Sequence, residues 1–212
     1  MGKGLLVTFE GIEGSGKTTQ AEKAHRELEL QGYKCVFTRE PGGTGLSEKI
    51  RPLLLDESNT EMSSVCELFL YLASRSQNVS QMIRPALDSK AIVIADRFSD
   101  STRAYQGGGR GLDTETIRRL NDLATDGLRP DITILFDIDP AEGLRRSGSR
   151  DRIEMEDIEF HRRVRAEFLR IAEEEPGRVF EINGEDAIDS IHRQVMTLIS
   201  QRLAQQTRSQ GG

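Results

Sequence analysis

The sequence predicts an α/β fold of three layers, in which a five-stranded parallel sheet lies between helices on both faces. Apolar runs of strand length alternate with longer helical stretches along the 212-residue chain. These runs are apolar throughout, which is typical of parallel strands buried on both faces. The first run leads through a glycine-rich turn into a helix, and such turns bind ligands at the carboxyl ends of the strands.

Each element follows from apolar runs, helical periodicity and the positions of glycine and proline. We expect strands at 5–9, 35–38, 91–95, 132–136 and 179–182. We expect helices at 17–31, 46–55, 61–88 (long enough for two), 114–125, 158–175 and 187–203. Residues 1–204 then form a single domain with a lid at about 143–154, and the polar residues 205–212 form a flexible tail.

Composition excludes several classes of protein. The net charge of −6 argues against a general nucleic-acid binder, which usually carries a basic face. No apolar run approaches the roughly 20 residues of a membrane span, and the first strand begins too early for a signal peptide. Cys35 and Cys66 form no CxxC pair, so we expect core thiols in a reducing cytoplasm.

The turn after the first strand fits the pattern G-x-x-x-x-G-K-[ST] in full. Its glycines let backbone N–H groups wrap around phosphates at the start of a helix. Lys17 adds a full positive charge toward the outer phosphates, and the Thr18 hydroxyl can bind magnesium. We therefore expect ATP phosphates to bind here, at Gly11, Ile12, Glu13, Gly14, Ser15, Gly16, Lys17, Thr18 and Thr19.

A carboxylate and an arginine follow the third predicted strand. Asp96 can hold the magnesium ion together with Thr18, and Arg97 then faces the phosphates. Asp137, after the fourth strand, is a competing carboxylate. Because it precedes a turn and a helix start, we interpret Asp137 as structural.

Further candidates lie near the same edge of the sheet, each with a plainer alternative. Arg39 and Arg51 could meet a second anion or simply be solvated. Tyr71 and Arg75 share one helix face, where the ring could stack on a nucleobase and the guanidinium could hydrogen-bond it. Alternatively, Tyr71 belongs to the core and Arg75 to the surface. The glycine run at 107–109 follows polar groups that could bind a ligand, or it forms a flexible loop only.

The segment after the fourth strand is rich in arginine. Four guanidinium groups in eight residues repel one another unless an anion joins them, which favours a mobile lid closing over phosphates. A solvated charged face is the alternative. The four are Arg145, Arg146, Arg150 and Arg152.

Four motifs in order make the chain resemble the bacterial thymidylate kinases, over about residues 5–203. They are FEGIEGSGKTT at 9–19, TREPGGT at 38–44, DRF at 96–98 and AYQGGG at 104–109. The second and fourth are far more selective than the glycine loop. The resemblance implies a P-loop kinase fold that transfers the γ-phosphoryl group of ATP to dTMP with Mg²⁺, as a cytoplasmic homodimer.

The resemblance also implies roles for single residues. Lys17, Asp96, Arg97 and a lid arginine would be catalytic, with Arg150 first and Arg146 and Arg152 behind it. Glu13 would meet the sugar 3′-hydroxyl of dTMP and also take part in catalysis, while Tyr105 would crowd the 2′ position. Arg97 would also hold the phosphate of dTMP, and the remaining dTMP-binding residues would be Arg39, Arg51, Tyr71, Arg75, Ser101, Thr102 and Gln106.

The chain departs from the family pattern at two positions. Tyr71 stands where phenylalanine is common, and Phe98 where tyrosine or histidine is common. Gly14 stands where some relatives carry a catalytic arginine, whereas the bacterial subclass supplies that cation from the lid. Two other functions remain open from the residues alone: another small-molecule kinase, or a nucleotide-hydrolysing switch. No Asn-Lys-x-Asp segment for guanine occurs, and an ATPase acting on nucleic acid does not fit the acidic balance.

Overall fold

The computed structural model describes residues 4–148 and 151–208. Its strands are β1 (Leu5–Glu10), β2 (Cys35–Arg39), β3 (Ile92–Asp96), β4 (Ile132–Asp137) and β5 (Val179–Asn183). Its α-helices are α1 (Lys17–Leu30), α2 (Ser47–Leu55), α3 (Ser64–Asn78), α4 (Arg84–Asp88), α5 (Ser99–Thr102), α6 (Thr114–Thr125), α7 (Pro140–Ser147), α8 (Ile158–Glu174) and α9 (Ile188–Arg208). Two π-helical segments join them, η1 (Val79–Ile83) and η2 (Arg103–Gly109).

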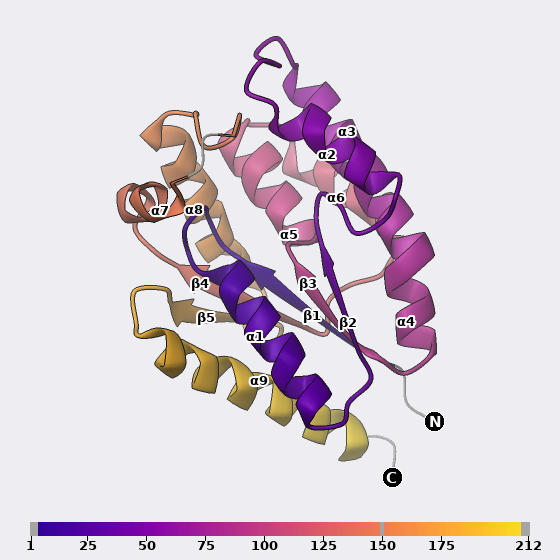
Figure 1. Cartoon of the computed structure of the whole chain (residues 1–212). Helices are drawn as coiled ribbons and strands as arrows, with labels where there is room; N and C mark the ends of the chain where they lie inside the picture. Colours follow the sequence, from indigo (N-terminus) through magenta and orange to yellow (C-terminus); the bar gives the residue numbers. More distant parts are fainter. Residues whose placement is uncertain (1–3, 149–150, 209–212) are drawn as a thin grey trace.

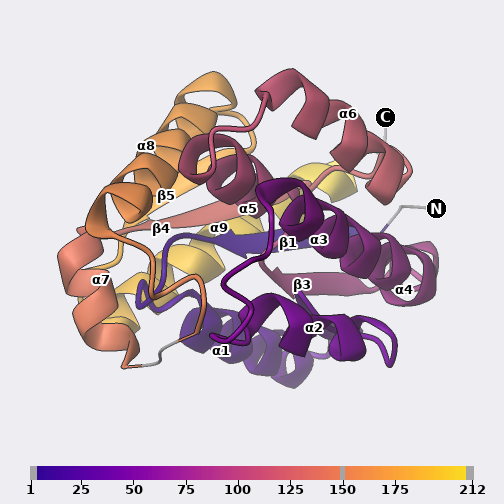
Figure 2. The ribbon, with the colours of Figure 1, turned by 90° about the horizontal axis from the view of Figure 1, so that it is seen from above.

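The five strands form one parallel sheet in the order β2-β3-β1-β4-β5, which confirms the predicted fold class (Figure 1). Helices α1 and α9 cover one face, while α3, α4, α6 and α8 cover the other (Figure 2). Strand β1 lies at the centre of the sheet, with β3 and β2 on one side and β4 and β5 on the other. In such sheets a ligand is expected in the crevice beyond the carboxyl end of the central strand.

Alternate residues of β1 pack on opposite sides of the sheet. Leu5, Val7 and Phe9 join the apolar core under α1 and α9, whereas Leu6 faces the core beneath α4. At the carboxyl end of the strand, the second face carries a charged residue, Glu10, which is fully buried. The change from apolar to charged burial therefore marks the end of the sheet where a site is built.

The structure differs from the predictions in three elements. The stretch from α5 through η2 is helical, although its glycines suggested a loop. A Cβ at Gly109 would lie 2.5 Å from the ring of Phe160, so glycine lets η2 approach α8 closely. Helix α7 was expected only as a helix start. Helix α9 runs to Arg208 instead of ending at 203, so the predicted flexible tail begins as helix, and 209–212 lie outside the described residues.

The two cysteines are free thiols with different surroundings. Cys35 is half-buried and burial raises its pKa to about 12, but Cys66 is exposed. The expectation of two core thiols is therefore wrong for Cys66, because the buried face of α3 runs through Leu68, Leu72 and Arg75 instead. Within the described part of the chain, no helix is long and apolar enough to cross a bilayer.

Candidate active site

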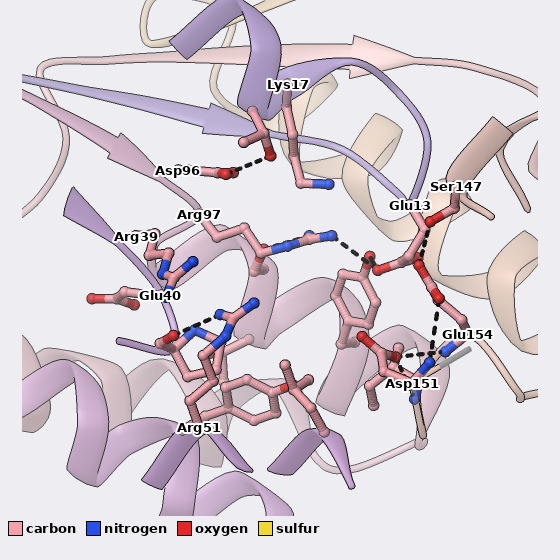
Figure 3. Close-up of a pocket in the computed structure, with 18 of the residues that line it drawn as sticks. Glu13, Lys17, Arg39, Glu40, Arg51, Asp96, Arg97, Ser147, Asp151 and Glu154 are labelled. Atoms are coloured by element: carbon pink, nitrogen blue, oxygen red, sulfur yellow. Dashed lines mark hydrogen bonds and ion pairs between the residues drawn. The ribbon is translucent and has the colours of Figure 1, made fainter. Parts of the chain in front are cut away.

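A cavity of about 330 Å³ opens at the carboxyl ends of β1, β2 and β3 (Figure 3). Its walls come from the β1–α1 turn, the loop after β2, helix α3, the segment after β3 and the residues after α7. Fourteen predicted site residues line it, although they are far apart in sequence: Glu13, Gly14, Lys17, Thr18, Arg39, Arg51, Tyr71, Arg75, Asp96, Arg97, Ser101, Thr102, Tyr105 and Gln106.

The β1–α1 turn presents the start of α1 to this cavity. Gly16 precedes the helix with a φ of 86°, a left-handed conformation that favours glycine. Lys17 donates from Nζ to the carbonyl of Ile12 at 3.1 Å, and burial together with the charge of Arg97 lowers its pKa to about 8. The buried hydroxyl of Ser15 has no protein partner in the residues described. The turn thus offers a cation, a free hydroxyl and helix N–H groups to an anion.

Asp96 and Thr18 meet where α1 faces the end of β3. The Thr18 hydroxyl donates to Asp96 Oδ2 at 2.6 Å (Figure 3), while Asp96 Oδ1 is buried without a partner in the described residues. A hydroxyl and an unpaired carboxylate oxygen beside a phosphate loop suit Mg²⁺, which prefers few protein oxygens plus phosphate and water. No group of three or more metal-ligating His, Cys, Asp or Glu side chains occurs in the described residues.

Arg97 crosses the middle of the cavity. Its backbone has a φ of 72°, so the chain turns sharply after β3 and the side chain points back toward the β1–α1 turn. The guanidinium donates to the carbonyl of Gly11 at 2.9 Å, to Ser101 Oγ at 3.2 Å and to Glu13 Oε1 at 2.9 Å. These three contacts fix its position.

Glu13 is the acidic counterpart of this cluster (Figure 3). The hydroxyl of Tyr105 donates to its Oε1 at 2.6 Å, and Nδ1 of the buried His161 lies 3.5 Å from its Oε2. Burial opposes ionisation, but the contact with His161 and the charges of Arg97 and Lys17 hold the pKa of Glu13 well below its usual range. Glu13 is therefore a carboxylate at neutral pH, with Oε2 free of any hydrogen bond in the described chain.

Arg75 anchors the far wall of the cavity from α3. It is 1% exposed and forms an ion pair with the buried Glu40, with Nε 2.7 Å from Oε2. Its Nη1 donates to Thr102 Oγ1 at 2.6 Å and to Asn121 Oδ1 at 2.7 Å, and its Nη2 donates to the carbonyl of Phe98 at 2.9 Å. This network holds one face of the guanidinium rigid while the residue still lines the cavity.

Arg39 and Arg51 reach the rim between β2 and α2. Arg39 is half-exposed and pairs with Glu48 at 3.1 Å. Arg51 donates from Nη1 to the carbonyl of Pro41 at 2.7 Å, and burial followed by the charge of Arg39 lowers its pKa. The charges of both arginines act on Glu48, so the two cations share this carboxylate, and both also line the cavity.

The predicted lid arginines do not meet in the cavity. Arg146 pairs with Glu142 and donates to the carbonyl of Gly184, and Arg152 is buried against Glu67 at 2.6 Å; neither lines the cavity. Arg150, the first choice for the catalytic arginine, lies outside the described residues. The segment instead brings Ser147, Asp151, Ile153 and Glu154 to the cavity wall (Figure 3).

Sequence reasoning missed the buried carboxylates that hold the site together. Glu10 accepts hydrogen bonds from Phe98 N at 2.7 Å and from Ser101 N and Oγ at 3.3 and 2.5 Å. Glu40 stands inside the TREPGGT motif, so its place beside Arg39 was a usable signal. Glu67 stands four residues before Tyr71 and eight before Arg75, on one helix face, which was a second signal. Asp137 pairs with Arg165 at 2.6 Å, as its structural interpretation requires.

Known proteins share this sequence and geometry. A family model described as thymidylate kinase matches residues 9–195. The thymidylate kinase of Pelobacter propionicus is 47% identical over 207 residues, covering 93% of this chain and 94% of its own. That of Desulfosudis oleivorans is 50% identical over 184 residues, covering 82% and 86%. The crystal structure of thymidylate kinase from Ehrlichia chaffeensis matches with a TM-score of 0.77 and 39% identity, over 94% of this chain and 99% of that one.

Proposed function

This chain belongs to the thymidylate kinase family and is a phosphotransferase, and we propose that it transfers the γ-phosphoryl group of ATP to dTMP with Mg²⁺. The observation that supports this best is the meeting of Lys17, Arg97 and Glu13 in one cavity, with Arg75 on its far wall. Cations at the phosphate end and polar groups at the other end suit a nucleotide whose phosphate faces the β1–α1 turn.

On the donor side, the β1–α1 turn and Lys17 would bind the phosphates of ATP. Thr18 and Asp96 would hold Mg²⁺, which supplies positive charge to the transferring phosphoryl group when it is bound. The other loop positions, Gly11 to Gly16 and Thr19, would contribute backbone N–H groups and the Ser15 hydroxyl. Because Lys17 is buried, its charge is poorly screened by water and acts strongly on a nearby phosphate.

On the acceptor side, Arg97 and the rim cations Arg39 and Arg51 would hold the phosphate of dTMP. Glu13 Oε2 would accept a hydrogen bond from the sugar 3′-hydroxyl, and Tyr105 would exclude a 2′-hydroxyl. Tyr71 would stack on the base, whose polar edge would meet Arg75, Thr102 and Gln106, while Ser101 would keep Arg97 in place.

Phosphoryl transfer asks the protein mainly to position two polyanions and neutralise their charge. Arg97 donates to both the Gly11 carbonyl and Glu13, so it would lie between the two substrates and lower the repulsion between their phosphates. No general base is needed, since the acceptor phosphate is largely ionised at neutral pH. Arg150 remains our first choice for the lid arginine that completes this charge.

We further propose that the protein is a cytoplasmic homodimer. The free thiols agree with a reducing compartment. Val65 and Phe69 are 50% and 55% exposed one helical turn apart on α3, and Leu123 on the adjacent α6 is 78% exposed. Exposed apolar residues gathered on neighbouring helices favour association. Sedimentation of the parent and of Phe69→Glu tests this, since a dimer through this face would dissociate in the variant.

A coupled assay of ADP release with ATP, Mg²⁺ and a panel of nucleoside monophosphates tests the enzymatic proposal. We expect dTMP to be the preferred acceptor and Lys17→Ala to lose at least about a hundredfold in rate, as for loss of one transition-state donor. Among Arg146→Ala, Arg150→Ala and Arg152→Ala, the loss should be largest for Arg150. If dTMP releases no more ADP than buffer, the proposed reaction is wrong.

A further inference from the structure

Glu67 is a fully buried carboxylate in the first turn of α3, behind the base end of the cavity. Its Oε1 accepts from Gln106 Nε2 at 2.9 Å and from Arg110 Nε at 3.1 Å. Its Oε2 accepts from Arg110 Nη2 at 2.9 Å and lies 2.6 Å from Arg152 Nη2. One buried carboxylate thus joins α3, η2 and the segment that follows α7.

This carboxylate stays ionised. Burial disfavours the charge, but hydrogen bonds from Arg110 and Gln106 and the charges of Arg110 and Arg152 keep the pKa of Glu67 below its ordinary value. An ionised carboxylate only accepts hydrogen bonds. Gln106 must therefore turn its NH₂ group toward Glu67, and its amide cannot flip without breaking that contact.

The fixed amide leaves one polar atom for a ligand. Gln106 is 1% exposed and lines the cavity, so its Oε1 must point away from Glu67. Among the described residues no donor to that oxygen is recorded. Gln106 therefore offers a hydrogen-bond acceptor to the cavity. Glu67 determines that this group is an acceptor and not a donor.

Donors complement this acceptor on the neighbouring wall. Four of the five N–H groups of Arg75 are bonded to protein, through Nε, both N–H of Nη1 and one of Nη2. The remaining Nη2 N–H has no hydrogen-bond partner among residues 4–148 and 151–208, and Arg75 lines the cavity, so this group could donate to a ligand there. Thr102 Oγ1 already accepts from Arg75, so its own proton is also available. The wall thus offers donors from Arg75 and Thr102 and an acceptor from Gln106.

We propose that Glu67 is a positioning residue that orients the Gln106 amide and thereby selects pyrimidines that pair a ring N–H with a carbonyl. Thymine and uracil present this edge, whereas cytosine presents an unprotonated ring nitrogen and an amino group. Cytosine would set two acceptors against each other at Gln106 and two donors against each other at Arg75, which costs binding because buried polar groups are left unpaired. The inference rests on the proposed function, because it concerns the acceptor base.

The test compares kcat/KM for dTMP, dUMP and dCMP in the parent and in Glu67→Gln. A neutral amide at position 67 can donate as well as accept, so Gln106 is free to flip. We expect the dTMP-to-dCMP ratio to fall by at least about tenfold, the scale of one buried hydrogen-bonding partner. The dTMP-to-dUMP ratio should stay at the parent's value, because both bases share the same edge.

Two more variants separate this role from a structural one. Arg110→Gln removes hydrogen bonds to the same carboxylate but leaves it facing Gln106, so its dTMP-to-dCMP ratio should equal the parent's. Gln106→Met removes the amide itself, so it should lower the dTMP-to-dCMP ratio of kcat/KM. This second variant gives a result even if Glu67→Gln does not fold. The inference is overturned if Glu67→Gln lowers kcat/KM by the same factor for all three substrates. It is also overturned if Gln106→Met keeps the parent's dTMP-to-dCMP ratio of kcat/KM. A parent inactive on dTMP would instead refute the proposed function.

Discussion

Replacing Arg97 by alanine tests the central geometry of the site. The change removes a guanidinium that donates to the Gly11 carbonyl, Ser101 Oγ and Glu13 Oε1 and is 17% exposed. In an environment with an effective dielectric constant of about 20, two unit charges about 4 Å apart interact by about 4 kcal/mol. Loss of a single transition-state donor costs about 2.7–4 kcal/mol. We therefore expect kcat/KM for dTMP to fall between about a hundredfold and about a thousandfold.

Folding should survive this change, because the Tyr105 hydroxyl still donates to Glu13 at 2.6 Å. ADP release measured at varied dTMP and saturating ATP reports the effect, and thermal unfolding of the same samples checks the fold. Arg165→Ala is the matched control: it also removes a carboxylate-paired arginine, from Asp137, but outside the cavity. A loss below about tenfold for Arg97→Ala, or an equal loss in the control, refutes the reasoning.

Three further predictions concern stability and the phosphate loop. Arg75→Leu leaves the buried Glu40 without its cation, so urea unfolding should show a loss of about 3–5 kcal/mol. Burial and then the charge of Asp100 raise the pKa of Glu10 to about 7, so the folded protein holds a proton that the unfolded chain releases above about 4.5. Glu10 therefore lowers the free energy of unfolding as the pH rises from 4.5 to 7, and urea denaturation at both pH values should show a smaller fall in Glu10→Gln than in the parent. Gly143→Ala would place a Cβ 2.5 Å from the Glu13 carbonyl of the β1–α1 turn, so the KM for ATP should rise several-fold. This rise is expected although alanine has a higher helix propensity than glycine. An unchanged KM would contradict the prediction and show that α7 moves away freely.

The sheet could be predicted because its strands are apolar on both faces and end at distinctive residues. Every predicted strand overlaps an observed one, and the residues after Phe9, Thr38 and Ala95 do gather at one edge. Asp137 pairs with Arg165 of α8 and does not line the cavity, in agreement with the structural interpretation, although this partner is distant in sequence. Local sequence patterns were therefore enough to predict the parallel sheet and the edge of the sheet where the cavity lies.

Tertiary pairing could not be predicted in the same way. Nothing local indicates that Glu67 binds Arg152, because the two stand far apart in sequence and meet only when the segment after α7 folds against α3. The arginine cluster predicted a free cationic lid, yet three of its members, Arg145, Arg146 and Arg152, are already paired with carboxylates. Similarly, the glycines of η2 have low helix propensity, and only contact with α8 at Gly109 makes the helical turn understandable.

Four of the cations that line the cavity, all except the rim residue Arg39, fall into two groups according to the groups they contact. Arg75 and Arg97 are each paired with a buried or half-buried carboxylate, so their positions are fixed before any ligand arrives. Lys17 and Arg51 donate only to backbone carbonyls in the recorded hydrogen bonds, and burial lowers the pKa of each. Nearby carboxylates oppose this effect, Asp96 most strongly for Lys17 and Glu48 for Arg51, so a bound anion would add to negative charge that is already present. In the proposed reaction, polyphosphate at Lys17 and a monophosphate near Arg51 would both stabilise these cations, and the two substrates would then lie on opposite sides of Arg97.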